Sequence, residues 1–198
     1  MVILAQRDEL KFHQFYDKRS VNMYEEKTIE SKEIYDGKML NLRIEKVKLH
    51  NGKESYREII AHPGACAIVA NNKGKILLVR QFRKPFNKML LELPAGKLDV
   101  DEDPLECAKR ELKEETGYTA NNIKKIGQTF TSPGYSDEVI HIYYSDELTH
   151  GECTPDENEF VDVVEIEIND VLTMIKSGEI CDGKTQTGFM LALEYLKN

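Results

Sequence analysis

The chain has 198 residues, of which 40% are hydrophobic and 31% are charged, and its formal net charge is −8. This length allows one domain with a sizeable core and a modest extension. The negative charge argues against nucleic-acid and anionic-membrane partners, since both are negatively charged themselves.

The cysteines and the N-terminus indicate the compartment. Cys66, Cys107, Cys153 and Cys181 form neither a CxxC pair nor a zinc-binding spacing with the histidines, so we interpret them as reduced and structural. The apolar run at residues 2–5 is too short for a signal peptide, and no stretch approaches the length needed to span a bilayer. The sequence therefore predicts a cytoplasmic protein.

The first clear pattern in the chain is an alternation of apolar and polar residues over 39–50, which predicts a strand. The alternation changes phase, so we expect a bulge near Glu45. Asn51-Gly52 is a strong hairpin-turn signal, and residues 55–61 are expected to form the returning strand.

The sequence His62-Pro63-Gly64 breaks this pattern and marks a domain boundary. We therefore interpret residues 1–61 as an N-terminal extension and residues 62–198 as the main domain, and we assign no function to residues 1–24. Apolar runs predict further strands at residues 65–70, 75–82, 89–93, 123–130, 138–144 and 160–168. Together with a central and a terminal helix, these strands predict a mixed sheet between helices.

Three helices are expected, and the one that follows Asp103 has the clearest end signals. Asp103 is a good N-cap, Pro104 suits the first helical position, and Glu106 completes a capping-box pattern. Gly117 can adopt the left-handed conformation that ends a helix. Two later helices are predicted: a short one capped by Asn169 and ending at Gly178, and a final one over residues 184–197, with Phe189, Leu193 and Leu196 facing inward.

Within the central helix, Leu105, Ala108 and Leu112 recur at helical spacing and predict a narrow buried stripe. Glu111 and Glu115 lie on another face, together with Glu114. Acidic runs on helices are ordinarily solvated. Like charges four residues apart, however, destabilise a helix by roughly 0.2–0.5 kcal/mol per pair.

A divalent cation would reverse the sign of that interaction. Magnesium suits the position, because it takes carboxylate and carbonyl oxygens and usually binds together with phosphates. The carbonyl of Ala95 lies in the loop before the helix, and Gly96 would allow a close backbone approach.

Residues 96–118, GKLDVDEDPLECAKRELKEETGY, resemble the Nudix box without insertion or deletion. The match comprises a glycine, five residues, a glutamate, seven residues, and Arg-Glu-Leu-Lys-Glu-Glu-Thr-Gly. Only Tyr118 departs from the family, which prefers an aliphatic residue there. The resemblance implies a Nudix-type α/β/α sandwich with a mixed sheet, extended by an N-terminal antiparallel hairpin or sheet. It also implies hydrolysis of a nucleoside diphosphate linked to another group.

The resemblance also implies roles for the box residues. Glu111 and Glu115 would bind Mg²⁺, with Mn²⁺ as a substitute ion and the Ala95 carbonyl as a further ligand. Glu114 would help these two residues to carry the metal and would count among the catalytic residues. The resemblance also places Arg110 among the catalytic residues. Together with Glu102, Arg110 would mainly hold the loop and the helix together.

Motifs outside the box are similar to the ADP-ribose pyrophosphatase branch of the Nudix family. These are Tyr56-Arg57-Glu58, His62-Pro63-Gly64-Ala65, the runs at residues 79–83 and 91–96, and Ser132-Pro133-Gly134, whose proline falls sixteen residues after Gly117. The resemblance implies ADP-ribose as substrate and a homodimer in which the N-terminal hairpin crosses to the partner. The substrate-binding residues it implies are Arg57, Glu58, Arg83, Leu98, Pro133 and Glu138. Arg80 stays open between this role and a surface ion pair.

A base for the attacking water is expected in the acidic loop at residues 156–159. By their position in this branch, Glu157 would be the base and Glu159 a further metal ligand, with Glu159 and Glu138 as alternative bases. The implied products are AMP and ribose 5-phosphate. Two other functions stay open: hydrolysis of another nucleoside diphosphate sugar or a dinucleoside polyphosphate, and a non-catalytic nucleotide-sensing Nudix module.

Overall fold

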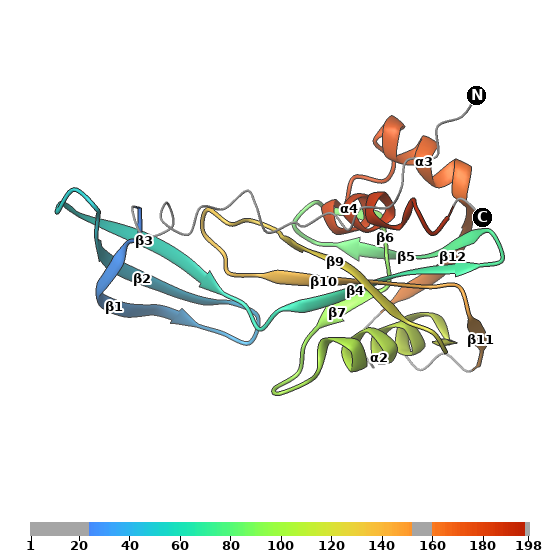
Figure 1. Cartoon of the computed structure of the whole chain (residues 1–198), viewed down its shortest axis with the longest axis horizontal. Helices are drawn as coiled ribbons and strands as arrows, with labels where there is room; N and C mark the ends of the chain where they lie inside the picture. The colour runs from blue at the N-terminus through green and yellow to red at the C-terminus, as the bar shows by residue number, and fades with distance from the viewer. Residues whose placement is uncertain (1–23, 152–159, 197–198) are drawn as a thin grey trace, which may run out of the picture. The chain divides into compact units, whose positions relative to one another are not determined.

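The computed structural model describes residues 24–151 and 160–196, and the chain divides into two compact units at residues 59 and 60. The first unit contains a three-stranded antiparallel sheet, and the second contains a seven-stranded mixed sheet (Figure 1). Within the described residues, no helix has both the length and the apolar character needed to cross a membrane.

The sheet of the first unit follows chain order, with β1 (Lys27–Asp36), β2 (Asn41–Lys48) and β3 (Glu54–Ala61) side by side. The two strands predicted for the hairpin, β2 and β3, are confirmed. The turn between them is also confirmed: Gly52 has a φ of 82° and donates its N–H to the carbonyl of Leu49 at 2.9 Å.

Two details of this sheet differ from the prediction. The bulge expected near Glu45 is wrong, because the register shifts lie on β1, between Thr28 and Glu30 and between Glu33 and Tyr35. The extra residues therefore belong to the partner strand. Strand β1 itself was not predicted: all ten of its residues are exposed, so no buried face imposes an alternating pattern.

The mixed sheet has the order β12-β5-β4-β10-β9, with β6 paired to β5 and β7 paired to β4. The pair β4–β10 is parallel, and the other pairs are antiparallel. A separate pair joins β8 to β11. The bounds are β4 (Ala65–Asn72), β5 (Lys75–Arg83), β6 (Lys88–Glu92), β7 (Ala95–Lys97), β8 (Tyr118–Ala120), β9 (Lys124–Phe130), β10 (Val139–Ser145), β11 (Leu148–His150) and β12 (Val161–Glu167).

All six strands predicted for the second unit are present. The three that were missed, β7, β8 and β11, have three residues each and are too short to show a period. Helix α2 covers one face of the sheet, and α3 and α4 cover the other (Figure 1). The helix bounds are α2 (Pro104–Thr116), α3 (Ile168–Ser177) and α4 (Gly183–Ala192).

Strand β4 is buried over its first six residues because helices cover both of its faces. Alternate residues point to opposite faces: Val69 belongs to the core cluster that contains Phe189 of α4, and Ile68 belongs to the cluster that contains Leu112 of α2. The predicted α/β/α sandwich is confirmed, with β4 at its centre.

Helix α2 begins and ends where predicted. The Asp103 carboxylate accepts the N–H of Leu105 at 2.8 Å, and Gly117 ends the helix with a φ of 75°. The capping-box contact expected from Glu106 is wrong: its carboxylate accepts from Lys109 at 2.7 Å, one turn further along the helix.

The ends of the last two helices also differ from the prediction. The N-cap position of α3 is Glu167 rather than Asn169, because the helix follows β12 without a loop, and Glu167 makes no side-chain cap hydrogen bond. The helix ends before Gly178 as expected. Helix α4 ends at Ala192 and is shorter than predicted, since the chain then turns and Tyr195 stacks on Tyr144 at a ring distance of 5.0 Å. Phe189 is buried, and Leu193 and Leu196 are partly buried against the same core, as predicted.

Candidate functional site

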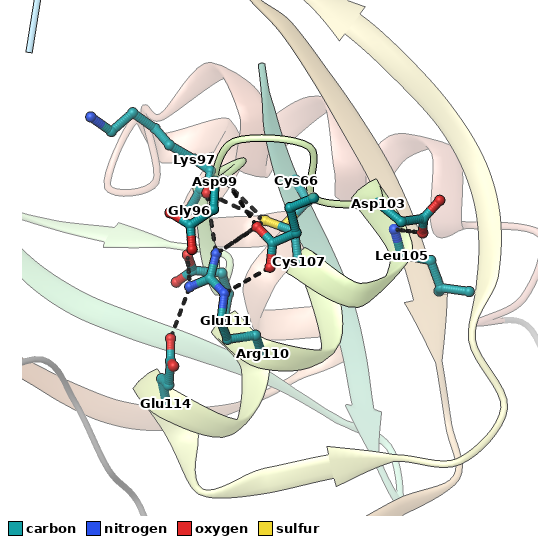
Figure 2. Close-up of polar contacts among 11 residues, drawn as sticks. Cys66, Gly96, Lys97, Asp99, Asp103, Leu105, Cys107, Arg110, Glu111 and Glu114 are labelled. Carbon is teal, nitrogen blue, oxygen red and sulfur yellow. Dashed lines mark hydrogen bonds and ion pairs between the residues drawn. The ribbon is translucent and has the colours of Figure 1, made fainter. Parts of the chain in front are cut away.

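Arg110 joins the loop before α2 to the helix itself, and Figure 2 shows its guanidinium among carboxylates. Its Nε and Nη2 donate to the two carboxylate oxygens of Glu102, both at 2.9 Å. Its Nη1 donates to Glu111 at 2.8 Å and to Glu114 at 3.0 Å. A planar guanidinium with five donors suits such a set of acceptors. Arg110 therefore fixes carboxylates of the loop and the helix together, as the sequence predicted.

These contacts change the pKa values of both partners. The hydrogen bonds to Glu102 raise the pKa of Arg110, against the opposing effect of burial. The same hydrogen bonds lower the pKa of Glu102 from 4.5 to about 2, and the backbone N–H of Asp99, 3.0 Å from the Glu102 carboxylate, lowers it further. Both residues are thus held in their charged forms.

We expect Glu102 to contribute to the pH dependence of stability. Folding lowers the pKa of Glu102 from 4.5 to about 2. Its contribution to the free energy of unfolding is therefore fully present above pH 4.5 and is lost as the pH falls toward 2. Glu102→Gln should therefore reduce the free energy of unfolding more near neutral pH than near the acid end of that window. Urea unfolding of both proteins across the window measures the difference. An equal difference at every pH would contradict the assignment.

Glu111 and Glu115 are both buried, with 8% and 4% of their surface exposed. The carboxylate of Glu115 accepts the N–H of Ala95 at 2.9 Å. At Gly96, a Cβ atom would lie 1.8 Å from Oε1 of Glu111. The close backbone approach predicted at Gly96 is confirmed, because β7 passes directly beside the two carboxylates.

The donors around this acidic pair suit a hard divalent cation. They are the carboxylates of Glu111 and Glu115 and the neighbouring carbonyl of Ala95, and oxygen is the ligand type that Mg²⁺ prefers. The glycine at position 96 leaves space for the Glu111 carboxylate. In the part of the chain that the structure describes, no three acidic, histidine or cysteine side chains form a ready ligand cluster. The predicted base Glu157 and the predicted ligand Glu159 lie outside the described residues.

A second group of charges involves Arg83, the last residue of β5, and Glu92, the last residue of β6. Arg83 donates from Nε and Nη2 to the carboxylate of Glu92 at 2.7 Å each. Lys184, near the start of α4, donates to the same carboxylate and, at 3.1 Å, to Asp182. The charge of Glu115 contributes to raising the pKa of Arg83, after the larger effect of the Glu92 hydrogen bonds. Arg83 therefore lies in the electrostatic neighbourhood of the acidic pair.

Glu92 is charged although it is almost fully buried. Only 2% of its surface is exposed, and burial alone would raise its pKa. The contacts with Arg83 and Lys184 outweigh burial and lower the pKa to about 2. The sequence analysis did not single out Glu92 or Lys184. A signal was present, because a glutamate inside the apolar run at residues 89–93 is rarely buried without a partner.

Arg57 and Glu58, two of the predicted substrate contacts, lie on β3 in the first unit. Arg57 donates from Nε to Glu26 at 2.8 Å and from Nη1 to the carbonyl of Tyr56 at 2.8 Å. Glu58 is exposed. Their roles in substrate binding stay predictions.

The remaining predicted contacts lie in the second unit. Leu98 donates its backbone N–H to the carbonyl of Gly64 at 3.1 Å. Glu138 lies 3.6 Å from Nε2 of His62, and Pro133 is exposed in the loop before β10. These residues also stay predictions as substrate contacts. Arg80 is exposed on β5.

Two of the cysteines meet in the core beneath α2. The Sγ atoms of Cys66 on β4 and Cys107 on α2 are 2.9 Å apart, and both residues are fully buried and free. The contact with Cys66 and the burial of the thiol raise the pKa of Cys107. The structural role predicted for these two residues agrees with their place in the core.

Comparison with known proteins adds a family match. Residues 60–184 match the model of the NUDIX domain, which covers the whole of the site in the second unit described above. A solved structure described as an ADP compounds hydrolase has the same fold, with a TM-score of 0.80 at 20% identity over 88% of this chain and 96% of that chain.

Two curated relatives match almost their entire length. The ADP-ribose pyrophosphatase of Bacillus subtilis (strain 168) is 46% identical over 176 residues, which cover 87% of this chain and 93% of the relative. The methanol dehydrogenase activator of Bacillus methanolicus is 43% identical over 178 residues, which cover 88% of this chain and 94% of the relative.

Proposed function

Because the chain belongs to the NUDIX domain family, we propose that it hydrolyses the diphosphate of ADP-ribose to AMP and ribose 5-phosphate. The observation that carries this proposal is the identity of 46%, over 87% of the chain, with an ADP-ribose pyrophosphatase. The arrangement around Arg110, with Glu102, Glu111 and Glu114 all in place, supports catalysis over a purely regulatory module.

Nudix hydrolases typically use a divalent metal, and Mg²⁺ is the ion we propose here, with Mn²⁺ as a substitute. Glu111, Glu115, the Ala95 carbonyl and Glu159 would hold it. When bound, the ion would offset the charge of the diphosphate and lower the pKa of a water ligand. The Glu115 carboxylate already accepts the backbone N–H of Ala95 at 2.9 Å, which supports the assignment of both residues to one site.

Side chains of the protein carry out the other steps, which are phosphate binding and proton transfer. Arg83 binds phosphate oxygens through its guanidinium, which suits bidentate contacts with phosphate. Glu157 accepts the proton of the water that attacks one phosphorus, with Glu159 and Glu138 as the next candidates for this role. A bond forms between the water oxygen and that phosphorus, and the bond from the phosphorus to the bridging oxygen breaks. Glu114 acts through Arg110, which holds both it and Glu111.

A substrate panel tests the proposal. The purified full chain, with Mg²⁺, is incubated with ADP-ribose, another nucleoside diphosphate sugar and a dinucleoside polyphosphate, and the products are separated by chromatography. We expect kcat/KM to be highest for ADP-ribose, with AMP and ribose 5-phosphate as products. A higher kcat/KM for either other class would reassign the substrate. No turnover of any of the three would contradict hydrolysis of these compounds.

A second candidate function comes from the relative named methanol dehydrogenase activator, which is 43% identical over 88% of this chain. By this likeness the chain would raise the rate of a methanol dehydrogenase. The assay adds the purified chain to that dehydrogenase and follows methanol oxidation, with the Glu115→Gln variant as a control. Activation that survives this substitution would indicate a role that does not depend on hydrolysis.

We also propose that the first unit forms a homodimer. This unit has large exposed apolar side chains in and beside its sheet, and within its described residues only Val47 is a buried hydrophobic residue. A small sheet of this kind needs a packing partner. Deleting residues 1–61 should give a monomeric or aggregating protein with a raised KM for ADP-ribose. Gel filtration and kinetics measure both effects, and a truncated chain that stays soluble and fully active would refute the proposal. The exposed side chains are Tyr24, Ile29, Ile34, Tyr35, Met39, Leu40 and Tyr56.

A further inference from the structure

The guanidinium of Arg83 is held along one edge. Its Nε and Nη2 each donate to Glu92 at 2.7 Å, so two of its five N–H donors are engaged by one carboxylate. Glu92 is 2% exposed, whereas 41% of the Arg83 side chain is exposed. The Nε–Nη2 edge of the guanidinium is therefore anchored by a buried carboxylate, while the Nη1 group takes no part in this contact and the side chain stays partly exposed.

The anchor is itself fixed from the other side. Lys184 donates to the Glu92 carboxylate oxygen that also accepts from Nη2 of Arg83. Only 13% of the Lys184 side chain is exposed, and its ammonium group also donates to Asp182 at 3.1 Å. Glu92 is thus paired with two cations, and Lys184 holds its carboxylate in the place where it meets Arg83.

The support extends into the backbone. Asp182 caps α4 by accepting the N–H of Thr185 at 3.0 Å, and it also accepts the Thr185 hydroxyl at 2.6 Å. The Thr185 hydroxyl oxygen in turn accepts the N–H of Leu93, the residue after Glu92, at 2.8 Å. The start of α4 and the end of β6 are therefore joined at Glu92, through Lys184, and at Leu93, through Thr185.

We propose that Glu92, supported by Lys184, is a positioning residue that directs the Nη1 edge of Arg83 toward a phosphate of the substrate. The inference rests on the proposed function, in which Arg83 binds the diphosphate. An arginine side chain that samples many rotamers loses conformational entropy when it binds phosphate, whereas one already held in place loses less and binds more tightly. The charge of Glu115 also favours the charged form of Arg83, after the larger effect of Glu92.

The kinetic test uses Glu92→Gln, which keeps the shape of the side chain but removes its charge. If Glu92 acts through Arg83, KM for ADP-ribose should rise about tenfold or more while kcat changes less than about threefold. Arg83→Ala should likewise raise KM strongly and change kcat little. The double variant should be no worse than Arg83→Ala alone, because both changes remove one interaction. The proposal would be overturned if the effects of the two substitutions on KM multiply in the double variant. It would also be overturned if Glu92→Gln lowers the stability of the protein but leaves KM unchanged.

A matched control separates this effect from the general loss of a paired glutamate. Glu165 lies on β12 of the same sheet and accepts the hydroxyl of Tyr118 at 2.8 Å. Glu165→Gln should leave KM within about twofold of the parent value. A rise in KM equal to that of Glu92→Gln would show that the effect is not specific to Arg83.

A second readout does not depend on turnover. Nitrogen-15 NMR of the arginine Nε–H groups should show slowly exchanging signals, such as that expected for Arg110, whose Nε donates to Glu102. One of them should be lost in Arg83→Ala and should exchange rapidly in Glu92→Gln. Titration with ADP, without metal, should show weaker binding in both variants. If the parent hydrolyses no substrate, the proposed function fails while these measurements still test the role of Glu92. Unchanged exchange and unchanged ADP affinity in Glu92→Gln would overturn it.

A further variant covers the case in which Glu92→Gln does not fold. Lys184→Gln removes one of the two supporting cations and leaves the Arg83 contact with Glu92 in place. We expect faster exchange of the Arg83 Nε–H and a KM raised by about threefold, a smaller effect than that expected for Glu92→Gln. If the Arg83 Nε–H exchange rate and KM of this variant equal those of the parent, Lys184 does not support Glu92 in positioning Arg83.

Discussion

Replacing Glu115 by glutamine should lower kcat at least ~10³-fold, a loss comparable to that of a principal charge-stabilising group. Glu115 is 4% exposed, and its carboxylate accepts the N–H of Ala95 at 2.9 Å. The amide oxygen of glutamine can still accept that hydrogen bond, so the fold should change little. The substitution removes the negative charge of the carboxylate that we propose as a metal ligand.

The measurement is a steady-state titration with Mg²⁺ at saturating ADP-ribose, accompanied by thermal unfolding. Glu106→Gln is the matched control, because Glu106 lies on the same helix but its carboxylate pairs with Lys109 instead of facing β7. We expect this control to keep the parent kcat within about twofold. Near-parent turnover of Glu115→Gln at saturating Mg²⁺ would show that the charge of Glu115 is not required.

The parts of the site that the sequence predicted are local in the chain. The ends of α2 follow from Asp103, Pro104 and Gly117, which act within one turn of the helix. The closeness of Arg110 to Glu114 follows from helical spacing, because the two residues are four apart on α2. Such contacts need no knowledge of the fold.

The parts that were missed depend on residues far apart in the chain. Glu92 and Lys184 meet only because α4 returns to the end of β6. Cys66 and Cys107 meet because α2 packs on β4, and neither residue has a local motif. The two cysteines were predicted to be structural but not to meet, and only the fold brings each pair together.

The second of the two largest effects is expected from Gly96→Ala, a change of one methyl group. The new Cβ would lie 1.8 Å from Oε1 of Glu111 and 2.0 Å from its Cδ, so one of the two groups must move. Glu111 is 8% exposed, and its Oε1 accepts from Nη1 of Arg110 at 2.8 Å. The carboxylate can leave its place only by breaking that contact, and it would then no longer lie beside Glu115.

We therefore expect Gly96→Ala to lower kcat/KM by ~10²–10³, in the range observed when one charge-stabilising group is lost, and to raise the Mg²⁺ concentration needed for half-maximal rate. Gly183→Ala is the control, because a Cβ at Gly183 would meet nothing within 4 Å. The double variant Gly96→Ala, Glu111→Gln should be about as active as Gly96→Ala alone, since both changes remove the same carboxylate from the site. If Gly96→Ala keeps the parent Mg²⁺ dependence, the Glu111 carboxylate is not a metal ligand at the position that the structure gives it.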